Sequence, residues 1–246
     1  MESDAMTRAA IVTGATGGVG AATVEALLDR GYGVVAVDLA PPPAAWAEDE
    51  RIVPLTADVS QEASAAEAVA AAETRFGRLD LLVNNAGLFL RKPIEHTSVD
   101  DLQRLLAVNV VGAFVFTRAA VPALARTRGA IVNLGSISGL VGTPGQSAYA
   151  ITKGAIVQFT RQSAIEHAPL GIRVNAVAPG AIETEFMSKA VAAGSDPGLD
   201  WDELRRNNPL GRVSSAAEVA DAIVWLAGAE AVSGEILSID GGHTAR

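Results

Sequence analysis

AAIVTGATGGVGAATVEALLDRG, residues 9–31, decides the fold of this chain. The apolar run AAIVTG ends in glycine, and apolar side chains then recur at helical spacing until Gly31. This pattern predicts a strand, a glycine-rich turn and a helix. The turn reads T-G-x-x-x-G-x-G over residues 13–20, and its glycines allow a tight turn and a close backbone approach to a ligand. Because a helix N-terminus offers unpaired N–H groups and a positive dipole end, the turn is a candidate pyrophosphate site. A purely structural turn is the alternative interpretation.

The same alternation of strand and helix patterns continues along the whole chain. Near-continuous apolar runs such as residues 79–87 suit parallel strands that are buried on both faces. We therefore predict an α/β fold, a Rossmann-like doubly wound parallel sheet of about seven strands with helices on both faces and ligands at the carboxyl ends of the strands. The expected later strands are residues 33–39, 51–59, 79–87, 129–138, 171–180 and 234–242, and the expected later helices are 61–76, 98–126, 147–167 and 215–228.

Length and composition indicate a single domain. The 246 residues include 49% apolar and 19% charged residues, enough to bury a sizeable core, and no segment reads as a linker. Residues 1–7 are polar and unpatterned, so we expect a flexible tail followed by one domain over residues 8–246. The irregular segment 181–214 lies beyond the carboxyl end of a strand, where a substrate lid is often found.

Composition also excludes several classes of function. The absence of cysteine excludes disulfides, thiolate catalysis and sulfur-ligated metals, and His96, His167 and His243 have no ligand spacing, so we expect no metal site. A net charge of −9 argues against a nucleic-acid surface. No apolar run has the length of a membrane span, and the N-terminus MESDAMTR lacks the pattern of a signal peptide. We expect a cytoplasmic protein without membrane contact.

A carboxylate at the end of the second strand bears on the choice of dinucleotide. Asp38 follows Gly20 by 18 residues, in register with the glycine-rich turn. A carboxylate in that position can accept hydrogen bonds from both ribose hydroxyls of an adenosine and would repel a 2′-phosphate. The sequence therefore favours NAD over NADP, with a strand-terminating turn residue as the alternative.

Tyr149 and Lys153 lie four residues apart in the helical pattern 147–167, so their side chains can meet on one face. An unperturbed phenol titrates near pH ~10, and a close, poorly solvated ammonium can lower that pKa; a shift of three units would take roughly 4 kcal/mol. The same spacing arises by chance when a tyrosine faces a core and a lysine faces solvent. Ser136 ends the strand at 129–138, and Asn109 sits in mid-helix, where asparagine is a poor helix former and is either satisfied structurally or used.

Taken together, these residues resemble the short-chain dehydrogenase/reductase family over nearly the whole chain. The resemblance implies a single dinucleotide-binding and catalytic domain, an NAD(H)-dependent oxidoreductase that interconverts a secondary alcohol and a ketone. The motifs that carry it are, in order, TGATGGVG at 13–20, Asp58, NNAG at 84–87, Asn109, Ser136, Tyr149-x-x-x-Lys153, Pro179-Gly180 followed by Thr184, and the terminal IDGG.

The resemblance also implies roles for individual residues. Tyr149 would be the general acid for ketone reduction and, as phenolate, the base for alcohol oxidation. Lys153 would hold the nicotinamide ribose and stabilise the phenolate, and Ser136 would bind the reacting oxygen. Asn109 would support a water that links Lys153 to solvent. The implied cofactor contacts are Gly14, Thr16, Gly18, Val19, Gly20, Asp38, Leu39, Asp58, Val59, Asn85, Ala86, Gly87, Tyr149, Lys153, Pro179, Gly180, Ile182 and Thr184.

The substrate is less clearly indicated than the reaction. Mostly apolar pocket candidates favour a neutral or hydrophobic alcohol or ketone, although Arg91, Lys92 and Arg205 could reach an anion. The expected substrate contacts are Ser136, Ser138, Gln146, Tyr149 and Met187, with Leu88, Leu90, Leu140 and Trp201 as further pocket candidates.

Other functions on this scaffold stay open at this point. They are a 3-oxoacyl thioester reductase, an epimerase or dehydratase, and a non-catalytic dinucleotide-sensing protein. The family further implies a homotetramer or homodimer with contacts through the helix around Asn109, the helix after Tyr149 and residues 234–242.

Overall fold

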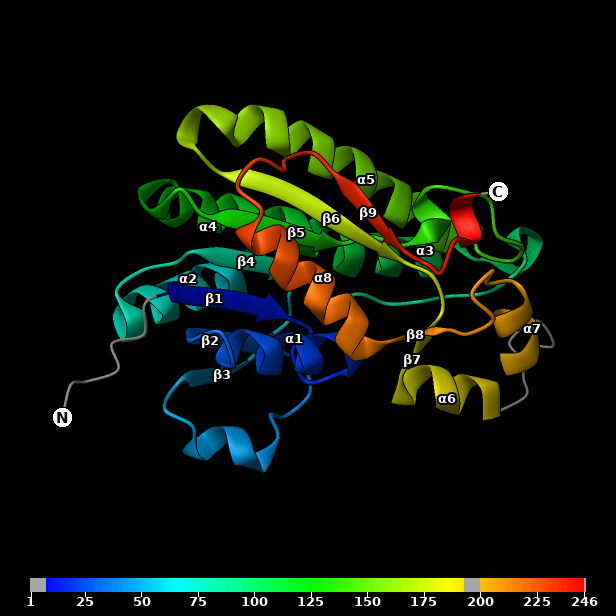
Figure 1. Cartoon of the computed structure of the whole chain (residues 1–246), viewed down its shortest axis with the longest axis horizontal. Helices are drawn as coiled ribbons and strands as arrows, with labels where there is room; N and C mark the ends of the chain where they lie inside the picture. The colour runs from blue at the N-terminus through cyan, green and yellow to red at the C-terminus, as the bar shows by residue number, and fades with distance from the viewer. Residues whose placement is uncertain (1–7, 193–199, 246) are drawn as a thin grey trace.

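A parallel sheet forms the centre of the molecule (Figure 1). The computed structural model describes residues 8–192 and 200–245, so the expected tail and part of the expected lid lie outside the described residues. Every neighbouring pair of strands in this sheet is parallel. The predicted doubly wound sheet of about seven strands is therefore confirmed. In spatial order the seven strands are β3 (Ile52–Thr56), β2 (Tyr32–Asp38), β1 (Arg8–Thr13), β4 (Leu81–Asn84), β5 (Ala130–Leu134), β6 (Arg173–Pro179) and β9 (Ile236–Ile239).

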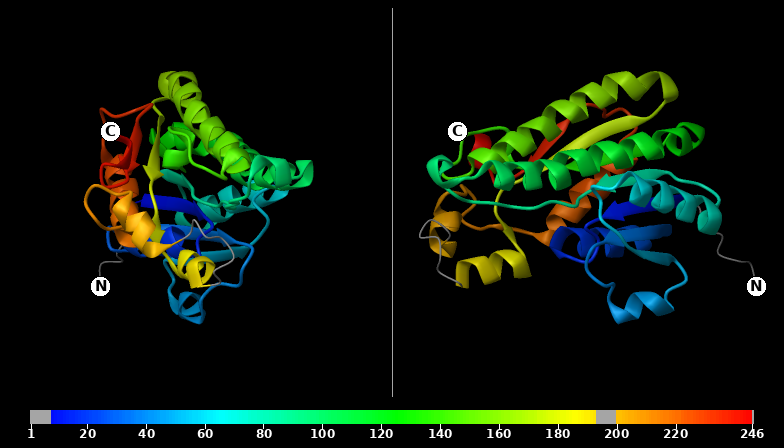
Figure 2. Two further views of the ribbon diagram at one scale, coloured as in Figure 1. Left: turned by 90° about the vertical axis from the view of Figure 1, so that its right-hand side faces the viewer. Right: turned by 180° about the vertical axis from the view of Figure 1, so that it is seen from behind.

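Helices cover both faces of the sheet (Figure 2). One face carries α1 (Gly18–Leu28) and α8 (Ala216–Gly228), which pack against each other. The opposite face carries α2 (Glu62–Phe76), α4 (Ala113–Thr127) and α5 (Ser147–His167). The central strands are consequently buried on both sides, which explains why their sequences are apolar without alternation.

Each face has its own hydrophobic core. Leu27 of α1 and Ile223 of α8 pack on one side, and Phe116 and Leu124 of α4 pack on the other. All four side chains are at most 1% exposed. Since burial of one large apolar side chain contributes roughly 1.5–3 kcal/mol, these two layers hold the strand ends in fixed positions.

The helix expected over residues 98–126 is interrupted. The chain runs from α3 (Val99–Leu106) through a π-helical segment, Ala107–Gly112, into α4. Ser98 caps α3 as predicted, in a capping box with Asp101. The π-helical segment contains Asn109, and such local widening of a helix is frequent at functional sites.

The continuous helical span Val99–Thr127 is long and apolar enough, by length and composition, to cross a membrane. This differs from the expectation drawn from apolar runs. In the fold the span packs as a core helix: 44% of its most apolar window is buried, and α4 contacts α2 and the sheet. The apolar composition therefore has a structural explanation in the described fold.

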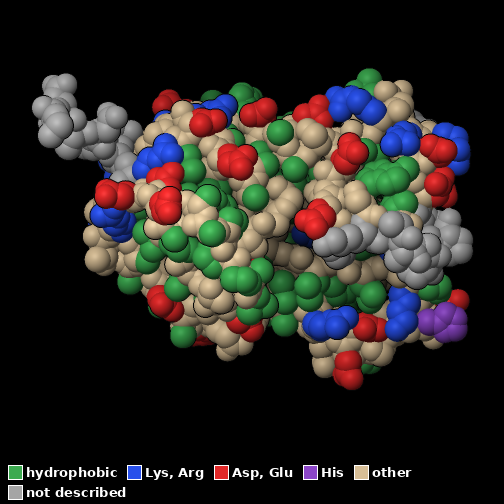
Figure 3. All heavy atoms as spheres, turned by 90° about the horizontal axis from the view of Figure 1, so that it is seen from below, with side chains coloured by type: hydrophobic (Ala, Val, Ile, Leu, Met, Phe, Trp, Pro, Cys, Tyr) green, Lys and Arg blue, Asp and Glu red, His purple; other side chains and the backbone are tan. Residues whose placement is uncertain are grey.

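The segment after β6 lies at the carboxyl ends of the strands, beside the C-terminal turn (Figure 1). Two short strands, β7 (Ile182–Glu183) and β8 (Ser214–Ser215), pair in parallel and bracket α6 (Glu185–Ala192) and α7 (Trp201–Arg206). On the molecular face shown in Figure 3, basic side chains are scattered among acidic ones. The remaining short turns of 3₁₀-helix are Ala44–Glu48, Ile94–His96, Ile137–Gly139, Ala168–Leu170 and His243–Ala245.

Arg173 joins the start of β6 to the end of α8. Its guanidinium donates hydrogen bonds to the carbonyl oxygens of Leu226, Ala227 and Ala229. These carbonyls lie in the last turn of the helix, where intrahelical donors run out. Burial lowers the pKa of Arg173, in keeping with its partly desolvated position.

We predict that Arg173→Met lowers the free energy of unfolding by about 2–3 kcal/mol, because the carbonyls lose their donors while the side-chain stem still packs. Urea denaturation followed by circular dichroism measures this change. Arg118→Met is the matched control. Arg118 pairs with Glu62 across 2.7 Å at an exposed site, and its loss should cost under about 1 kcal/mol. Equal losses in the two variants would contradict the proposed role of Arg173.

Candidate active site

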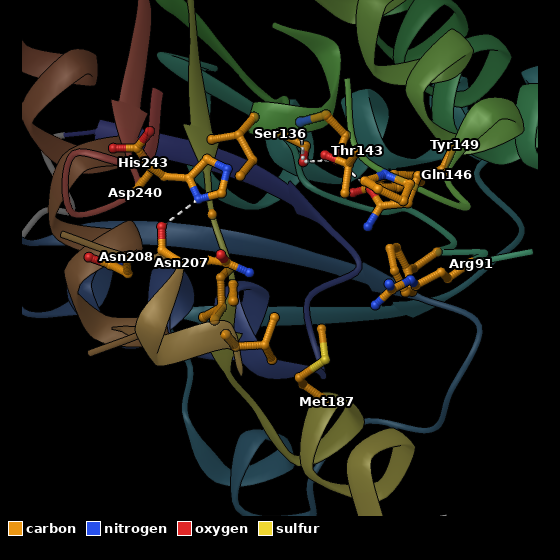
Figure 4. A pocket seen from close by; sticks show the side chains of 18 of the residues that line it. Arg91, Ser136, Thr143, Gln146, Tyr149, Met187, Asn207, Asn208, Asp240 and His243 are labelled. Atoms are coloured by element: carbon orange, nitrogen blue, oxygen red, sulfur yellow. Dashed lines mark hydrogen bonds between the residues drawn. The ribbon is translucent and has the colours of Figure 1, made fainter. Parts of the chain in front are cut away.

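The carboxyl ends of the strands surround a cavity of about 520 Å³ (Figure 4). Its walls come from the loop after β5, the start of α5, the segment around α6 and α7, and the C-terminal turn. Among its lining residues are all five predicted substrate contacts, Ser136, Ser138, Gln146, Tyr149 and Met187. Gly180, Ile182 and Thr184, predicted as cofactor contacts, line it too.

Ser136 and Tyr149 reach the cavity from neighbouring elements. β5 ends at Leu134, earlier than predicted, so Ser136 stands in an extended loop and caps the turn that follows. Tyr149 lies in the first turn of α5, with the ring of Phe89 edge-on to its own at 5.0 Å between centroids. Gly139 lets the turn pack directly on α5, since a Cβ there would meet the backbone of Lys153.

Lys153 is 3% exposed, and its Nζ donates a 2.6 Å hydrogen bond to the carbonyl oxygen of Leu134. The ammonium lies 5.7 Å from the centroid of the Tyr149 ring. Burial lowers the pKa of Lys153 to about 8 and raises the pKa of Tyr149 to about 12, while a hydrogen bond with the Ser136 side chain lowers the phenol pKa by less than burial raises it. The expectation of an acidified phenol is wrong in this structure, because burial of the phenol outweighs its hydrogen bond with Ser136, and the Lys153 ammonium donates to the Leu134 carbonyl.

Asn109 is fully buried and well hydrogen-bonded. Its Oδ1 accepts from the Leu88 N–H at 2.7 Å, and its Nδ2 donates to the Leu88 carbonyl at 2.9 Å and to Thr152 Oγ1 at 3.0 Å. Both amide protons are thus used to hold the loop after β4 against α5. Gly87 lies beside both Asn109 and Lys153, since a Cβ there would sit 3.4 Å from Asn109 Oδ1 and 3.7 Å from Lys153 Nζ. The expected water link stays a prediction.

A chain of hydrogen bonds leads away from Ser136. Its hydroxyl donates to Ser138 Oγ at 3.3 Å, and Ser138 donates to Gln146 Oε1 at 2.5 Å. A hydroxyl has a single proton and two lone pairs. Ser136 Oγ also accepts from the Ser138 N–H at 3.2 Å, and its proton can be redirected to an incoming oxygen.

The glycine-rich turn packs closely against the end of β4. A Cβ on Gly20 would overlap the carbonyl oxygen of Gly14, and Asn85 Nδ2 donates to the carbonyls of Thr13 and Gly14 at 2.8 and 2.9 Å. The Asn85 side chain thus holds the turn rather than pointing to a ligand. Thr184 lies over the turn, because a Cβ on Gly18 would meet its methyl group.

The N-terminus of α1 is left open for an anion. Its N-cap, Gly17, makes no side-chain cap, and the first turn holds no acidic residue. By contrast, α3 and α8 are closed by capping boxes of their own. A glycine cradle next to an uncapped helix N-terminus fits the pyrophosphate of a dinucleotide.

The carboxylate of Asp38 is already engaged in the structure. Its Oδ2 accepts from Thr16 N and Oγ1 at 2.9 and 2.8 Å, and its Oδ1 accepts from Ala40 N at 3.0 Å. A carboxylate has about four acceptor positions, so one remains for a ribose rather than the two that were expected. Leu39 beside it is 67% exposed.

Asp58 lies beyond β3 rather than within it. Its Oδ1 accepts from the backbone N–H and the hydroxyl of Ser60, and these hydrogen bonds lower the pKa of Asp58. Val59 beside it is buried. These two predicted cofactor contacts thus belong to a tight turn at the carboxyl end of the sheet.

Several pocket predictions differ from the structure. Of the three cations that could reach an anion, only Arg91 lines the cavity: Lys92 pairs with Asp101 at 3.0 Å, and Arg205 lies over the Trp201 ring. Within the described part of the chain, Leu88, Leu90, Leu140 and Trp201 are not lining residues. The sequence analysis did not predict twelve further lining residues, of which only Asp240 stood in a motif that had been noted: Phe89, Ile137, Gly142, Thr143, Pro144, Ala181, Glu203, Leu204, Asn207, Asn208, Asp240 and His243.

Comparisons with known proteins agree with this geometry. Residues 14–244 match a family model described as enoyl-(acyl carrier protein) reductase. The chain is 39% identical to 2-(R)-hydroxypropyl-CoM dehydrogenase of Xanthobacter autotrophicus, over 98% of this chain and 100% of the relative. It is 37% identical to trans-4-hydroxycyclohexanecarboxylate dehydrogenase of Sinomonas cyclohexanicum, over 97% of this chain and 93% of the relative.

Among solved structures, ElxO with NADP bound superposes with a TM-score of 0.91 at 31% identity, covering 98% of this chain and 100% of that one. The match to the family model extends from the glycine-rich turn to the C-terminal turn. With a family model over most of its length and dehydrogenases among its relatives, the chain belongs to the short-chain dehydrogenase/reductase family and is an enzyme that acts on hydroxyl groups.

Proposed function

We propose that this protein is an NAD(H)-dependent oxidoreductase that interconverts a secondary alcohol and a ketone, with Tyr149 as the general acid and base. The observation that carries the proposal is the meeting of Tyr149 and Ser136 at one cavity, with the buried ammonium of Lys153 5.7 Å from the phenol ring. A proton donor and a second hydroxyl converge on a space that a reacting oxygen can occupy. The names of two relatives, which contain hydroxypropyl-CoM and hydroxycyclohexanecarboxylate, support a substrate with a hydroxyl group.

Proton transfer is the part of the reaction that falls to Tyr149. In ketone reduction its phenol gives a proton to the carbonyl oxygen, and in alcohol oxidation the phenolate takes the hydroxyl proton. A protonated Lys153, whose Nζ lies 5.7 Å from the centroid of the phenol ring, favours the phenolate by charge attraction. The first turn of α5 adds the positive end of its dipole. Both effects oppose burial, which raises the pKa of the phenol and so favours its neutral form.

Ser136 supplies the second contact to the reacting oxygen. Its proton points to Ser138 in the structure, so substrate binding requires the hydroxyl to rotate toward the cavity. The rotated hydroxyl would stabilise the charge that develops on the oxygen during hydride transfer. Ser138 donates its own proton to Gln146 Oε1, so the Ser138–Gln146 hydrogen bond does not depend on the direction of the Ser136 hydroxyl.

The residues present fit a nicotinamide dinucleotide. The turn with Gly14, Gly18 and Gly20 would hold the phosphates, Asp38 the adenosine ribose, and Lys153 the nicotinamide ribose. When bound, the nicotinamide supplies or accepts the hydride. The Asp38 carboxylate, and a turn without a basic residue, support NAD over NADP. The structural neighbour ElxO has NADP bound in its solved structure.

Assembly and location complete the proposal. Exposed apolar side chains on the faces of α4, α5 and α8, Phe114, Ile151 and Trp225, support a homodimer or homotetramer whose mass light scattering would show. We place the enzyme in the cytoplasm. A 3-oxoacyl thioester reductase on the same scaffold is the second candidate, supported by Arg91 on the cavity wall.

We predict that Tyr149→Phe lowers kcat at least ~100-fold while the dissociation constant for NADH changes less than about threefold, because the variant loses the proton donor but keeps the ring. Turnover is followed by NADH absorbance and binding by NADH fluorescence. Tyr32→Phe is the control, since Tyr32 is the other tyrosine of the chain and lies buried in β2. Retention of most activity in Tyr149→Phe would refute the assigned role.

We predict opposite pH profiles for the two directions. With its pKa lowered to about 8, Lys153 loses its proton between about pH 7 and 9, while the phenol, with its pKa raised, stays protonated. Ketone reduction needs both protons and should decline above about pH 8. Alcohol oxidation needs the Tyr149–Lys153 pair with one of its two protons removed. The oxidation rate should therefore rise to about pH 8 and then become constant. A reduction rate that is constant to pH 10 would contradict this assignment.

We predict that kcat/KM is at least ~10-fold higher with NADH than with NADPH, because the Asp38 carboxylate repels a 2′-phosphate. Asp38→Asn should bring the two values closer, since the amide is neutral but its oxygen still accepts from Thr16. Initial rates at low cofactor concentration measure both ratios. Faster turnover of the unaltered enzyme with NADPH would reject the NAD assignment.

A further inference from the structure

The C-terminal turn closes the end of the cavity that lies away from Tyr149 (Figure 4). Asp240, 6% exposed, holds this turn: its carboxylate accepts from Gly242 N at 2.9 Å, Thr244 N at 2.8 Å and Thr244 Oγ1 at 2.6 Å. The backbone N–H of His243 also donates to the Asp240 carbonyl. The turn is thus a fixed wall that carries the His243 side chain.

The imidazole of His243 is anchored by one of its nitrogens. Nδ1 lies 2.9 Å from the carbonyl oxygen of Asn207, at the end of α7. A carbonyl oxygen only accepts, so Nδ1 carries the proton, and in the neutral ring Nε2 is a hydrogen-bond acceptor. Figure 4 shows the other ring nitrogen turned away from Asn207 toward the open middle of the cavity. Among residues 8–192 and 200–245, Nε2 has no hydrogen-bond partner.

The charges at this end of the cavity decide what His243 can bind. Asp240 and Glu203 both line it, and Glu203 lies one helical turn before Asn207, whose N–H donates to the Glu203 carbonyl. Arg91 lies on the other side, near Gln146 and Tyr149 (Figure 4). The negative charges of these two lining residues disfavour an anionic group beside His243, whereas a hydroxyl can donate to Nε2 without repulsion.

We propose that His243 is a specificity-determining residue whose Nε2 accepts a hydrogen bond from a second hydroxyl of the substrate. The inference rests on the proposed function, in which the first oxygen reacts between Tyr149 and Ser136. It names the substrate class: diols and other polyhydroxy compounds, in preference to simple alcohols. A substrate held at both ends would be fixed with its reacting carbon beside the phenol.

Oxidation of matched alcohols tests this inference. Cyclohexanol is compared with cyclohexane-1,2-, 1,3- and 1,4-diol by NADH formation, with kcat/KM expressed per hydroxyl group. For the best diol we expect a value about tenfold above that of cyclohexanol, mainly through a lower KM, which is the scale of one hydrogen bond. His243→Leu should bring this ratio close to one.

Two further variants separate recognition from structure. His243→Gln offers an amide oxygen as acceptor and should keep most of the preference for the diol. Thr244→Val removes a donor to Asp240 and loosens the turn without altering Nε2, so the ratio should stay near that of the unaltered enzyme. A thermal melt of each variant shows whether it is folded.

The possible failures are distinguishable. If cyclohexanol is oxidised as well as every diol, or if His243→Leu keeps the preference, the role of His243 is refuted while the proposed function stands. If neither cyclohexanol nor any diol yields NADH, although the protein binds NAD, the proposed function fails for this class of alcohols and the inference fails with it.

Discussion

The buried ammonium of Lys153 is the constraint around which the site is built. A cation that is 3% exposed is costly to desolvate unless a close acceptor compensates, and the carbonyl oxygen of Leu134 provides one at 2.6 Å. Leu134 ends β5, so this hydrogen bond fixes α5 against the end of that strand. Ser136 follows two residues later and Tyr149 stands one helical turn earlier on α5. The two hydroxyls that face the cavity are therefore placed by the same contact that satisfies the charge.

The surrounding elements bring the remaining parts to the same edge of the sheet. Asn109, in the π-helical segment, donates one amide hydrogen bond to the loop after β4 and one to α5. These two hydrogen bonds hold Gly87 beside Lys153. Asn85 ties the glycine-rich turn to the end of β4, leaving an uncapped helix N-terminus next to it. Parallel strands end at one edge, so a site assembled there draws residues from distant parts of the sequence without further folding cost.

The sequence predicted the sheet, the main helices and the central site residues because these depend on local patterns. Apolar runs marked the buried strands, and the glycine spacing and the Tyr149–Lys153 interval identified the turn and the catalytic helix. The raised pKa of Tyr149 could not be predicted in this way, because it comes from burial of the phenol in the folded chain, while the Lys153 ammonium donates to the Leu134 carbonyl. The π-helical segment around Asn109 was missed, although an asparagine in mid-helix was its one local signal. His243 was missed because its place in the cavity arises from contact between the C-terminal turn and α7.

A crystal structure of the enzyme with NADH and an unreactive analogue of the ketone substrate tests the central claim most directly. The account predicts that the analogue's oxygen lies within about 3.2 Å of both Tyr149 Oη and Ser136 Oγ. An analogue bound in the cavity with its oxygen away from both hydroxyls would contradict the assignment of Tyr149 and Ser136 to the reacting oxygen.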